Sequence, residues 1–472
     1  MSSWHIGAAN VRRFPTPSLD NAGSFRPADA WIGARMQEET SLSKRPFLSL
    51  LNTWILCAIL LVLASTYGFS FERGSKNSTA GGAEQGVAAA DSGNSAIVKV
   101  QNYAIYLLAL WVMLPLVKPV AAEFRRNLLI SGLLLWILMS CAWSNDAKAS
   151  LISGLRMSLD VALAFFLFKR YAINDLLKLL LLVGSVAAVG SIILILVLPQ
   201  YGLQGRDVIY ALGAWQGIFG HKNICGRMMT LLLLPAFFVQ LDGRWAKIFR
   251  FSYVMVLLVI IGMTHSVGSL LLCGACLSFI AIVHSLVKLK RIDALSLGTV
   301  VFGVMSAVTV AVVSNATALL NLFGKDPTMS GRTTLWASVM MSILKHPLAG
   351  YGYFAFWQGL TGESVNPILQ SHWPGLSYAE NGILELWLEL GAVAVFLYAL
   401  IYCGAVKNAI YCFRRYPSKR TMWYISVLFY VAFTNLWAGN LLTPSSLECV
   451  VPFIAYVGLR TEARRIRGLQ VV

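Results

Sequence analysis

Three basic side chains lie close together at the start of an apolar run. They are His221, Lys222 and Arg227 in the sequence GIFGHKNICGRMM at 217–229, with Asn223 between them. Free backbone N–H groups and the positive end of the macrodipole make a helix start a natural anion site, which basic side chains strengthen. The spacing therefore favours binding of a phosphate-like group. The alternative is that the lysine extends to lipid headgroups.

A second basic position lies in the sequence SGRTTLWASVMMSILKHPLAGYGYF at 330–354. Trp336, Val339 and Ile343 recur there at helical spacing, which predicts a helix lying along a membrane interface. Arg332 begins this helix. Its planar guanidinium is suited to bind a phosphate through two hydrogen bonds, so it is a second candidate for anion binding.

Acidic residues mark a third segment, SYAENGILELWLELG at 377–391. Glu380 precedes an apolar run, and Glu385 and Glu389 follow one and two turns later. Glutamates within a membrane span are energetically costly and usually face a polar cavity. The alternative for these two residues is pairing with basic residues of the bundle.

The elements that position these residues are predicted to be membrane-spanning helices. The chain has 472 residues, of which 57% are hydrophobic and 12% charged, and its mean hydropathy is +0.67. Apolar runs of about 20 residues recur along it, long enough to cross a bilayer. An all-α polytopic protein follows, because unpaired backbone groups are not tolerated in lipid. We expect twelve spans, at 48–70, 101–121, 127–143, 151–168, 176–198, 223–241, 249–264, 267–286, 294–318, 380–404, 422–438 and 446–458.

Lys and Arg residues are concentrated in the loops on one of the two sides of these spans, the side that carries both termini, which predicts that both termini are cytoplasmic. The basic excess, with a pI near 9.6, therefore indicates topology rather than nucleic-acid binding. Cys273 and Cys276 lie in an apolar helix pattern, which favours packing over zinc or redox chemistry. The expected organisation is a cytoplasmic tail at 1–47, a membrane domain at 48–458 with periplasmic loops at 72–98, 199–222 and 319–379, and a second tail at 459–472.

Four motifs occur in order along this layout: CAWSNDAKASL, GIFGHKNICGR, SGRTTLW followed by HPLAGYG, and ENGILELWLELG. Together they resemble the O-antigen ligase and polysaccharide polymerase superfamily, most closely its exopolysaccharide polymerase branch with the signature GIFxHKNxxG. The resemblance spans about residues 130–400. It implies transfer of a glycan from undecaprenyl diphosphate to an acceptor hydroxyl outside the inner membrane. The resemblance also implies a glycosyltransferase that needs no metal and no cofactor.

The resemblance also implies roles for particular residues. Arg332 would hold the diphosphate, and a base would take the acceptor proton. Glu380 stands where ligases place histidine, and His372 is the alternative base. Family members commonly carry arginine where this chain has Gln216; Arg206 or Lys222 would then supply the charge. The predicted substrate-binding residues are Arg206, His221, Lys222, Asn223, Arg227, Arg332 and Asn381.

The predicted function is that of an inner-membrane glycan polymerase in exopolysaccharide biosynthesis. Its predicted partners are the lipid-linked donor, the glycan acceptor and the bilayer, with polysaccharide export or chain-length proteins as further candidates. An O-antigen ligase is the alternative within the same class. A flippase or transporter is the alternative outside it, although such proteins often show repeated halves, and no internal repeat is evident in this chain.

Overall fold

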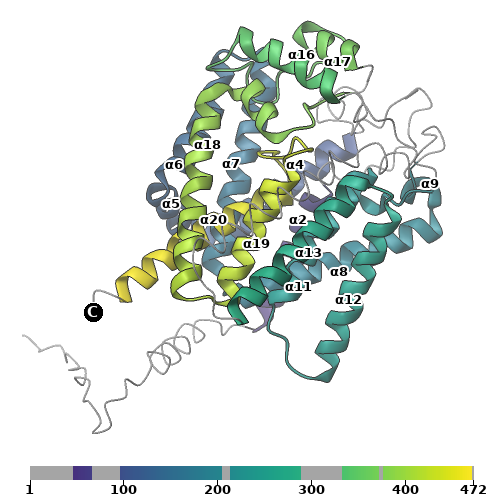
Figure 1. Ribbon diagram of the computed structural model, residues 1–472, viewed down its shortest axis with the longest axis vertical. Helices are drawn as coiled ribbons and strands as arrows, with labels where there is room; N and C mark the ends of the chain where they lie inside the picture. The colour runs from purple at the N-terminus through teal and green to yellow at the C-terminus, as the bar shows by residue number, and fades with distance from the viewer. Residues whose placement is uncertain (1–45, 66–95, 205–212, 289–331, 372–375, 470–472) are drawn as a thin grey trace, which may run out of the picture. The chain divides into compact units, whose positions relative to one another are not determined.

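The computed structural model describes residues 46–65, 96–204, 213–288, 332–371 and 376–469 (Figure 1). The chain falls into two units, Met1–Ser49 and Leu50–Val472. The predicted span 294–318, residues 72–95 of the predicted loop 72–98, and the candidates Arg206 and His372 lie outside the described residues. Residues 96–98 of that loop begin α4.

The described residues form helices and no strands, which confirms the predicted all-α class. The helices are α2 (Pro46–Ala64), α4 (Ala96–Met113), α5 (Val117–Arg126), α6 (Leu128–Met139), α7 (Ala147–Arg170), α8 (Ile173–Val197), α9 (Pro199–Gly202), α10 (Lys222–Leu233), α11 (Pro235–Phe238), α12 (Arg244–Met263), α13 (Val267–Lys288), α16 (Arg332–Lys345), α17 (Val365–Ser371), α18 (Gly382–Arg415), α19 (Lys419–Thr434) and α20 (Leu447–Leu469). Each expected span that the structure describes overlaps at least one of them.

Within the described part of the chain, six helical segments are long and apolar enough to cross a membrane. They are Tyr103–Arg126, Ala147–Arg170, Ile173–Val197, Arg244–Met263, Val267–Val287 and Gly382–Arg415. A multi-pass membrane protein is therefore supported, whereas the count of twelve spans stays a prediction. Several boundaries differ from expectation. The longest extensions are those of α18 to Arg415 and of α20 to Leu469, so that 459–469 is helical.

Polar residues of the motifs begin three of the helices. The Asp146 carboxylate accepts a hydrogen bond from the Ala149 amide at the start of α7. The Asn381 side chain accepts from two amides at the start of α18. His221 begins α10 in the same way, since its Nδ1 accepts from the Asn223 amide. Such caps satisfy N–H groups that the first turn of a helix leaves unpaired.

The starts of α10, α13 and α18 lie at one end of the second unit, where α16 and α17 also lie (Figure 1). At the opposite end, the last turns of α5, α7 and α18 are basic. There Glu123 binds Lys169 at 2.6 Å and Arg126 at 3.1 Å, which joins α5 to α7. The helices thus separate the motif-bearing end of the unit from a basic end.

Helix α16 has an apolar stripe, as predicted, but protein covers it. Leu335, Val339 and Ile343 are buried in a cluster with residues between Tyr351 and Leu388. The stripe that predicted an interfacial helix therefore packs on the following segment and on the start of α18. The physical reason is that the segment 351–379 carries its own large apolar side chains, which complete the cluster.

Candidate functional site

The predicted phosphate-binding arginine and the predicted base touch each other. Arg332 Nη2 lies 2.5 Å from Glu380 Oε2, and the two residues are 48 positions apart in the sequence. The Glu380 side chain is 7% exposed and the Arg332 side chain 24%. A buried carboxylate is therefore paired with a cation that keeps partial access to solvent.

Backbone contacts on either side fix the position of Glu380. Its φ of +52° places it in the left-handed region, where residues other than glycine are uncommon. Just before it, the Ala379 carbonyl accepts a hydrogen bond from Trp336 Nε1 of α16 at 2.9 Å. Just after it, Asn381 caps α18. A strained conformation that its neighbours hold in this way is common at functional sites.

The motif HPLAGYG packs against a break in α18. The break is at Gly391, whose φ of +74° and ψ of −179° are not helical. The Gly352 amide donates to the Glu389 carbonyl at 2.8 Å, and the Ala392 amide donates to the Pro347 carbonyl at 2.9 Å. The backbone groups freed by the break are thus satisfied within the protein, as a low-dielectric surrounding requires.

The motif CAWSND joins the same assembly. Trp143 Nε1 donates to the Ala349 carbonyl at 3.0 Å, and the Asn145 amide donates to the Tyr351 carbonyl at 3.1 Å. The Ser150 hydroxyl donates to the Tyr353 carbonyl at 2.8 Å. Three motifs that are far apart in sequence therefore meet around the start of α18.

The motif GHKN lies at the start of α10, beside α13. His221 and Lys222 are buried. Asn223 Oδ1 accepts a hydrogen bond from the Ser266 hydroxyl at 2.8 Å, which joins the start of α10 to the start of α13. The motif therefore contributes to helix packing, at the same end of the unit as Arg332.

Arg227 lies inside the helical unit rather than at its surface. Its Nε is 3.5 Å from Glu448 Oε1, and both side chains are buried. The Tyr430 hydroxyl donates to the same carboxylate at 2.5 Å and to the Arg227 carbonyl at 3.1 Å. This contact joins α10, α19 and α20 and gives Arg227 a structural partner.

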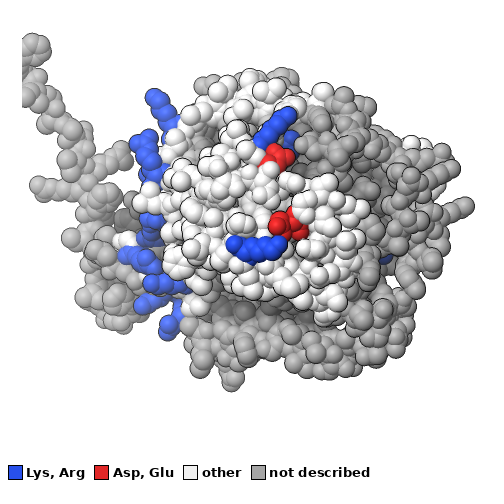
Figure 2. All heavy atoms as spheres, turned by 90° about the horizontal axis from the view of Figure 1, so that it is seen from above, with Lys and Arg blue, Asp and Glu red and all other residues white. Residues whose placement is uncertain are grey.

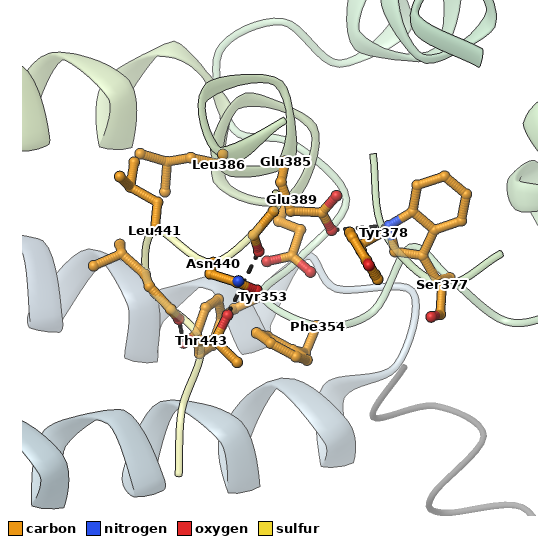
Figure 3. A pocket seen from close by; sticks show the side chains of 14 residues that line it. Tyr353, Phe354, Ser377, Tyr378, Glu385, Leu386, Glu389, Asn440, Leu441 and Thr443 are labelled. Carbon is orange, nitrogen blue, oxygen red and sulfur yellow. Dashed lines mark hydrogen bonds between the residues drawn. The ribbon is translucent and has the colours of Figure 1, made fainter. Parts of the chain in front are cut away.

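Next to Glu380, the structure contains a pocket lined by Glu385 and Glu389 (Figure 3). Its walls come from three segments: 353–357, 377–389 and 439–443. Trp357 Nε1 donates to Glu385 Oε1 at 2.8 Å, and the Ala379 amide donates to its other oxygen. Of the two interpretations of these glutamates, the structure supports the polar cavity.

The tyrosines of HPLAGYGY act as hydrogen-bond donors. Burial, assisted by the charge of Glu363, raises the pKa of the Tyr351 hydroxyl to about 12. Burial also raises the pKa of Tyr353 well above its ordinary value. Tyr351 donates to the Ser342 carbonyl at 2.9 Å, and Tyr353 donates to the Leu442 carbonyl at 2.5 Å. Both hydroxyls therefore stay protonated at neutral pH and hold the segment in place.

Sequence reasoning missed several residues of this site. Trp357, Tyr378 and Asn440 line the pocket, yet none lies at a spacing that singles it out. For Trp357 and Tyr378, the only signal in the sequence was the high aromatic content of the segment 351–378. Figure 2, which views the unit from this end, shows acidic and basic side chains together in isolated groups on a largely uncharged surface, and further basic side chains along the left edge.

The fold and the site define a multi-pass helical membrane protein whose charged site lies where several helices begin. A family model described as O-antigen ligase matches residues 252–399, which include both Arg332 and Glu380. The chain is also 25% identical to the exopolysaccharide production protein ExoQ of Rhizobium meliloti (strain 1021) over 353 residues, covering 71% of this chain and 78% of that protein. Both findings confirm the predicted resemblance to the O-antigen ligase and polysaccharide polymerase superfamily.

Proposed function

We propose that this protein is a polymerase that joins oligosaccharide repeat units carried on undecaprenyl diphosphate, at the periplasmic face of the inner membrane. The similarity to an exopolysaccharide production protein supports the polymer as product. The observation that carries the proposal is the ion pair between Arg332 and Glu380 beside a polar pocket. It unites a cation suited to a diphosphate with a carboxylate suited to take a proton.

In the proposed reaction, a hydroxyl of the acceptor glycan attacks the anomeric carbon of the donor glycan. The new C–O bond forms as the bond from that carbon to the diphosphate oxygen breaks. Glu380 takes the proton of the attacking hydroxyl, and the diphosphate leaves on its lipid with the negative charge that it gains. Arg332 stabilises that charge where it develops.

The contact between the two residues couples these events. While Glu380 is a carboxylate, its negative charge neutralises part of the positive charge of Arg332. When Glu380 takes up the proton it becomes neutral, and its attraction for the guanidinium falls. The arginine then interacts more strongly with the diphosphate, at the step in which the diphosphate becomes more negative.

A ligase that attaches glycan to lipid A core is the second candidate, because the matching family model is described as O-antigen ligase. The two functions differ in what accumulates when the gene is deleted. Loss of a polymerase leaves single repeat units on the lipid carrier, whereas loss of a ligase leaves long polymer there. Gel and mass analysis of carrier-linked glycans from a deletion strain distinguishes them, and unchanged polymer would contradict both.

The proposed reaction uses a lipid diphosphate donor and needs no metal. Among the described residues, no three His, Cys, Asp or Glu side chains come together as a metal site needs. Metal independence is a part of the proposal that an assay of purified protein with and without chelator would test.

A further inference from the structure

The pocket beside Glu380 has a composition different from that of a phosphate site. Its described lining contains two glutamates, Glu385 and Glu389, and none of the residues that line it is Lys, Arg or His. Both glutamates are buried. Glu385 and Glu389 are hydrogen-bonded to each other, so the pair shares a proton. The negative charge that the pair keeps repels a diphosphate, because the surrounding dielectric is low. The diphosphate therefore belongs on the Arg332 side of the site and not in this pocket.

The same lining suits an uncharged, hydroxyl-rich ligand. A carboxyl oxygen accepts hydrogen bonds from hydroxyl groups, and the hydroxyl of Thr443 and the amide of Asn440 add polar groups on the opposite wall. Trp357, Tyr378 and Phe354 supply aromatic surface, whose negative ring faces attract the weakly positive C–H groups of a sugar ring. Such a mixture of apolar walls and a few placed polar groups is typical of small-molecule sites.

The glutamates are held as a fixed part of this wall. Trp357 Nε1 and the Ala379 amide donate hydrogen bonds to the Glu385 carboxyl group. Ala379 directly precedes Glu380 in the chain. The backbone at Glu389 is held by Gly352. Figure 3 shows both side chains at the pocket, with Asn440 and Thr443 across from them. The pocket thus begins where the proposed base lies, because Tyr378 and Gly382 line it on either side of that base in the chain.

We propose that this pocket is the acceptor subsite: it binds the terminal sugar of the acceptor glycan through its hydroxyls, with Glu385 and Glu389 as hydrogen-bond acceptors. This inference rests on the proposed function. It divides the site by charge, with the lipid diphosphate on the side of Arg332, the acceptor sugar on the side of the two glutamates, and Glu380 between them.

The test measures binding of two probes to the purified full-length protein in lipid nanodiscs. One probe is the oligosaccharide repeat unit released by partial hydrolysis from the strain's own exopolysaccharide, without lipid or diphosphate. The other is undecaprenyl diphosphate. The variants are Glu389→Gln and Arg332→Ala, and Glu363→Gln is the matched control, because Glu363 is an exposed glutamate in the same outer segment that does not line the pocket.

Glu389→Gln should weaken oligosaccharide binding about three- to tenfold, the range for loss of one neutral hydrogen bond, because the amide replaces a carboxyl oxygen by an NH2 group. It should leave binding of undecaprenyl diphosphate within about twofold. Arg332→Ala should show the opposite pattern, and Glu363→Gln should match the wild type with both probes. Unchanged oligosaccharide binding in Glu389→Gln, or an equal loss with both probes, would overturn the subsite.

A second variant protects the test against misfolding. If Glu389→Gln lowers the melting temperature, Thr443→Val on the opposite wall is measured instead, with the same expected selectivity for the oligosaccharide. If neither variant is selective, the inference is wrong. Failure of the proposed function is seen separately: normal polymer in a deletion strain would refute the polymerase even where the oligosaccharide binds selectively.

Discussion

At the scale of single residues, the site depends on the ion pair between Arg332 and Glu380. Lys345 of α16 and Glu363 of the segment that follows form a second ion pair at 2.6 Å, but both side chains are exposed. Exposed pairs contribute little to stability. Because the two pairs are similar in geometry and differ in burial, the second serves as an internal control for the first.

Replacing Arg332 by alanine should nearly abolish polymer while the protein stays inserted. Loss of one charged contact to the leaving diphosphate removes on the order of 2–4 kcal/mol of transition-state stabilisation, or about 30- to 1000-fold in rate. Polymer yield and the turnover of lipid-linked repeat units measure the effect. Lys345→Ala should be close to wild type. Full activity in Arg332→Ala would remove this residue from the site.

Glu380→Gln should lose about a hundredfold or more in rate, because glutamine keeps the shape and hydrogen bonding of the side chain but cannot take a proton. Turnover of the purified variant is the measurement. Glu363→Gln is the control and should be unaffected. Normal turnover in Glu380→Gln, combined with its loss in His372→Ala, would identify histidine as the base.

A structural role of Arg227 can be distinguished from a role in substrate binding. Arg227→Met should destabilise the protein by about 3–5 kcal/mol, because it leaves the Glu448 carboxylate buried and unpaired. Adding Glu448→Gln should restore most of the stability, since glutamine is neutral and still accepts from Tyr430. Melting temperature and polymer yield are measured together. A stable double variant without polymer would assign Arg227 to the substrate; one with polymer would assign it to packing.

At the scale of elements, the break in α18 positions the two carboxyl groups of the pocket relative to the segment 347–352. Glu385 and Glu389 lie in the part of α18 before the break, and Gly391 ends that part. The freed backbone of the helix binds 347–352, which connects α18 to α16 and to the start of α7. The GYG turn therefore docks the segment 347–352 on α18.

Gly391→Ala should destabilise the protein by at least about 2 kcal/mol. Its backbone conformation is nearly exclusive to glycine, which makes other residues unfavourable by about 1–3 kcal/mol, and a new Cβ would overlap the Leu348 carbonyl. Thermal unfolding in detergent measures the change. Gly404→Ala is the matched control in the same helix, where a Cβ meets open space; it should be neutral or slightly stabilising. Equal melting of both variants would contradict the importance of the break.

At the scale of the whole molecule, the motif-bearing end and the basic end predict an orientation. Because cytoplasmic ends of membrane helices carry the excess of Lys and Arg, the end with Lys169 and Arg126 should face the cytoplasm. The starts of α10, α13 and α18 would then face the periplasm, where lipid-linked glycans are joined in the proposed function.

Reporter fusions test this orientation. Fusions at Gln85, Tyr210 and Leu360 should read periplasmic, and those at Lys290 and Arg415 should read cytoplasmic. Alkaline phosphatase and a cytoplasmic fluorescent protein give opposite signals at each position, so every fusion has its own control. Two or more reversed readings would overturn the orientation and the location of the site.

Hydropathy and the 3.6-residue period are local properties, so they predicted the helical class and the approximate place of the long apolar helices. The short helices α9 and α17, in predicted loops, were missed. Capping is also local, so Asp146 and Asn381 mark the starts of α7 and α18. Boundaries such as the extension of α20 to Leu469 were missed, since polar residues continue the helix beyond the apolar run.

Which side chains meet depends on the tertiary fold. Arg332 and Glu380 were candidates for separate roles, and their contact depends on how α16 packs on α18. The same packing covers the apolar stripe of α16 with protein, and it places Trp357 on Glu385. Such contacts join residues tens of positions apart. Local spacing cannot specify them, because they are set by which faces of the helices come together when the apolar surface is buried.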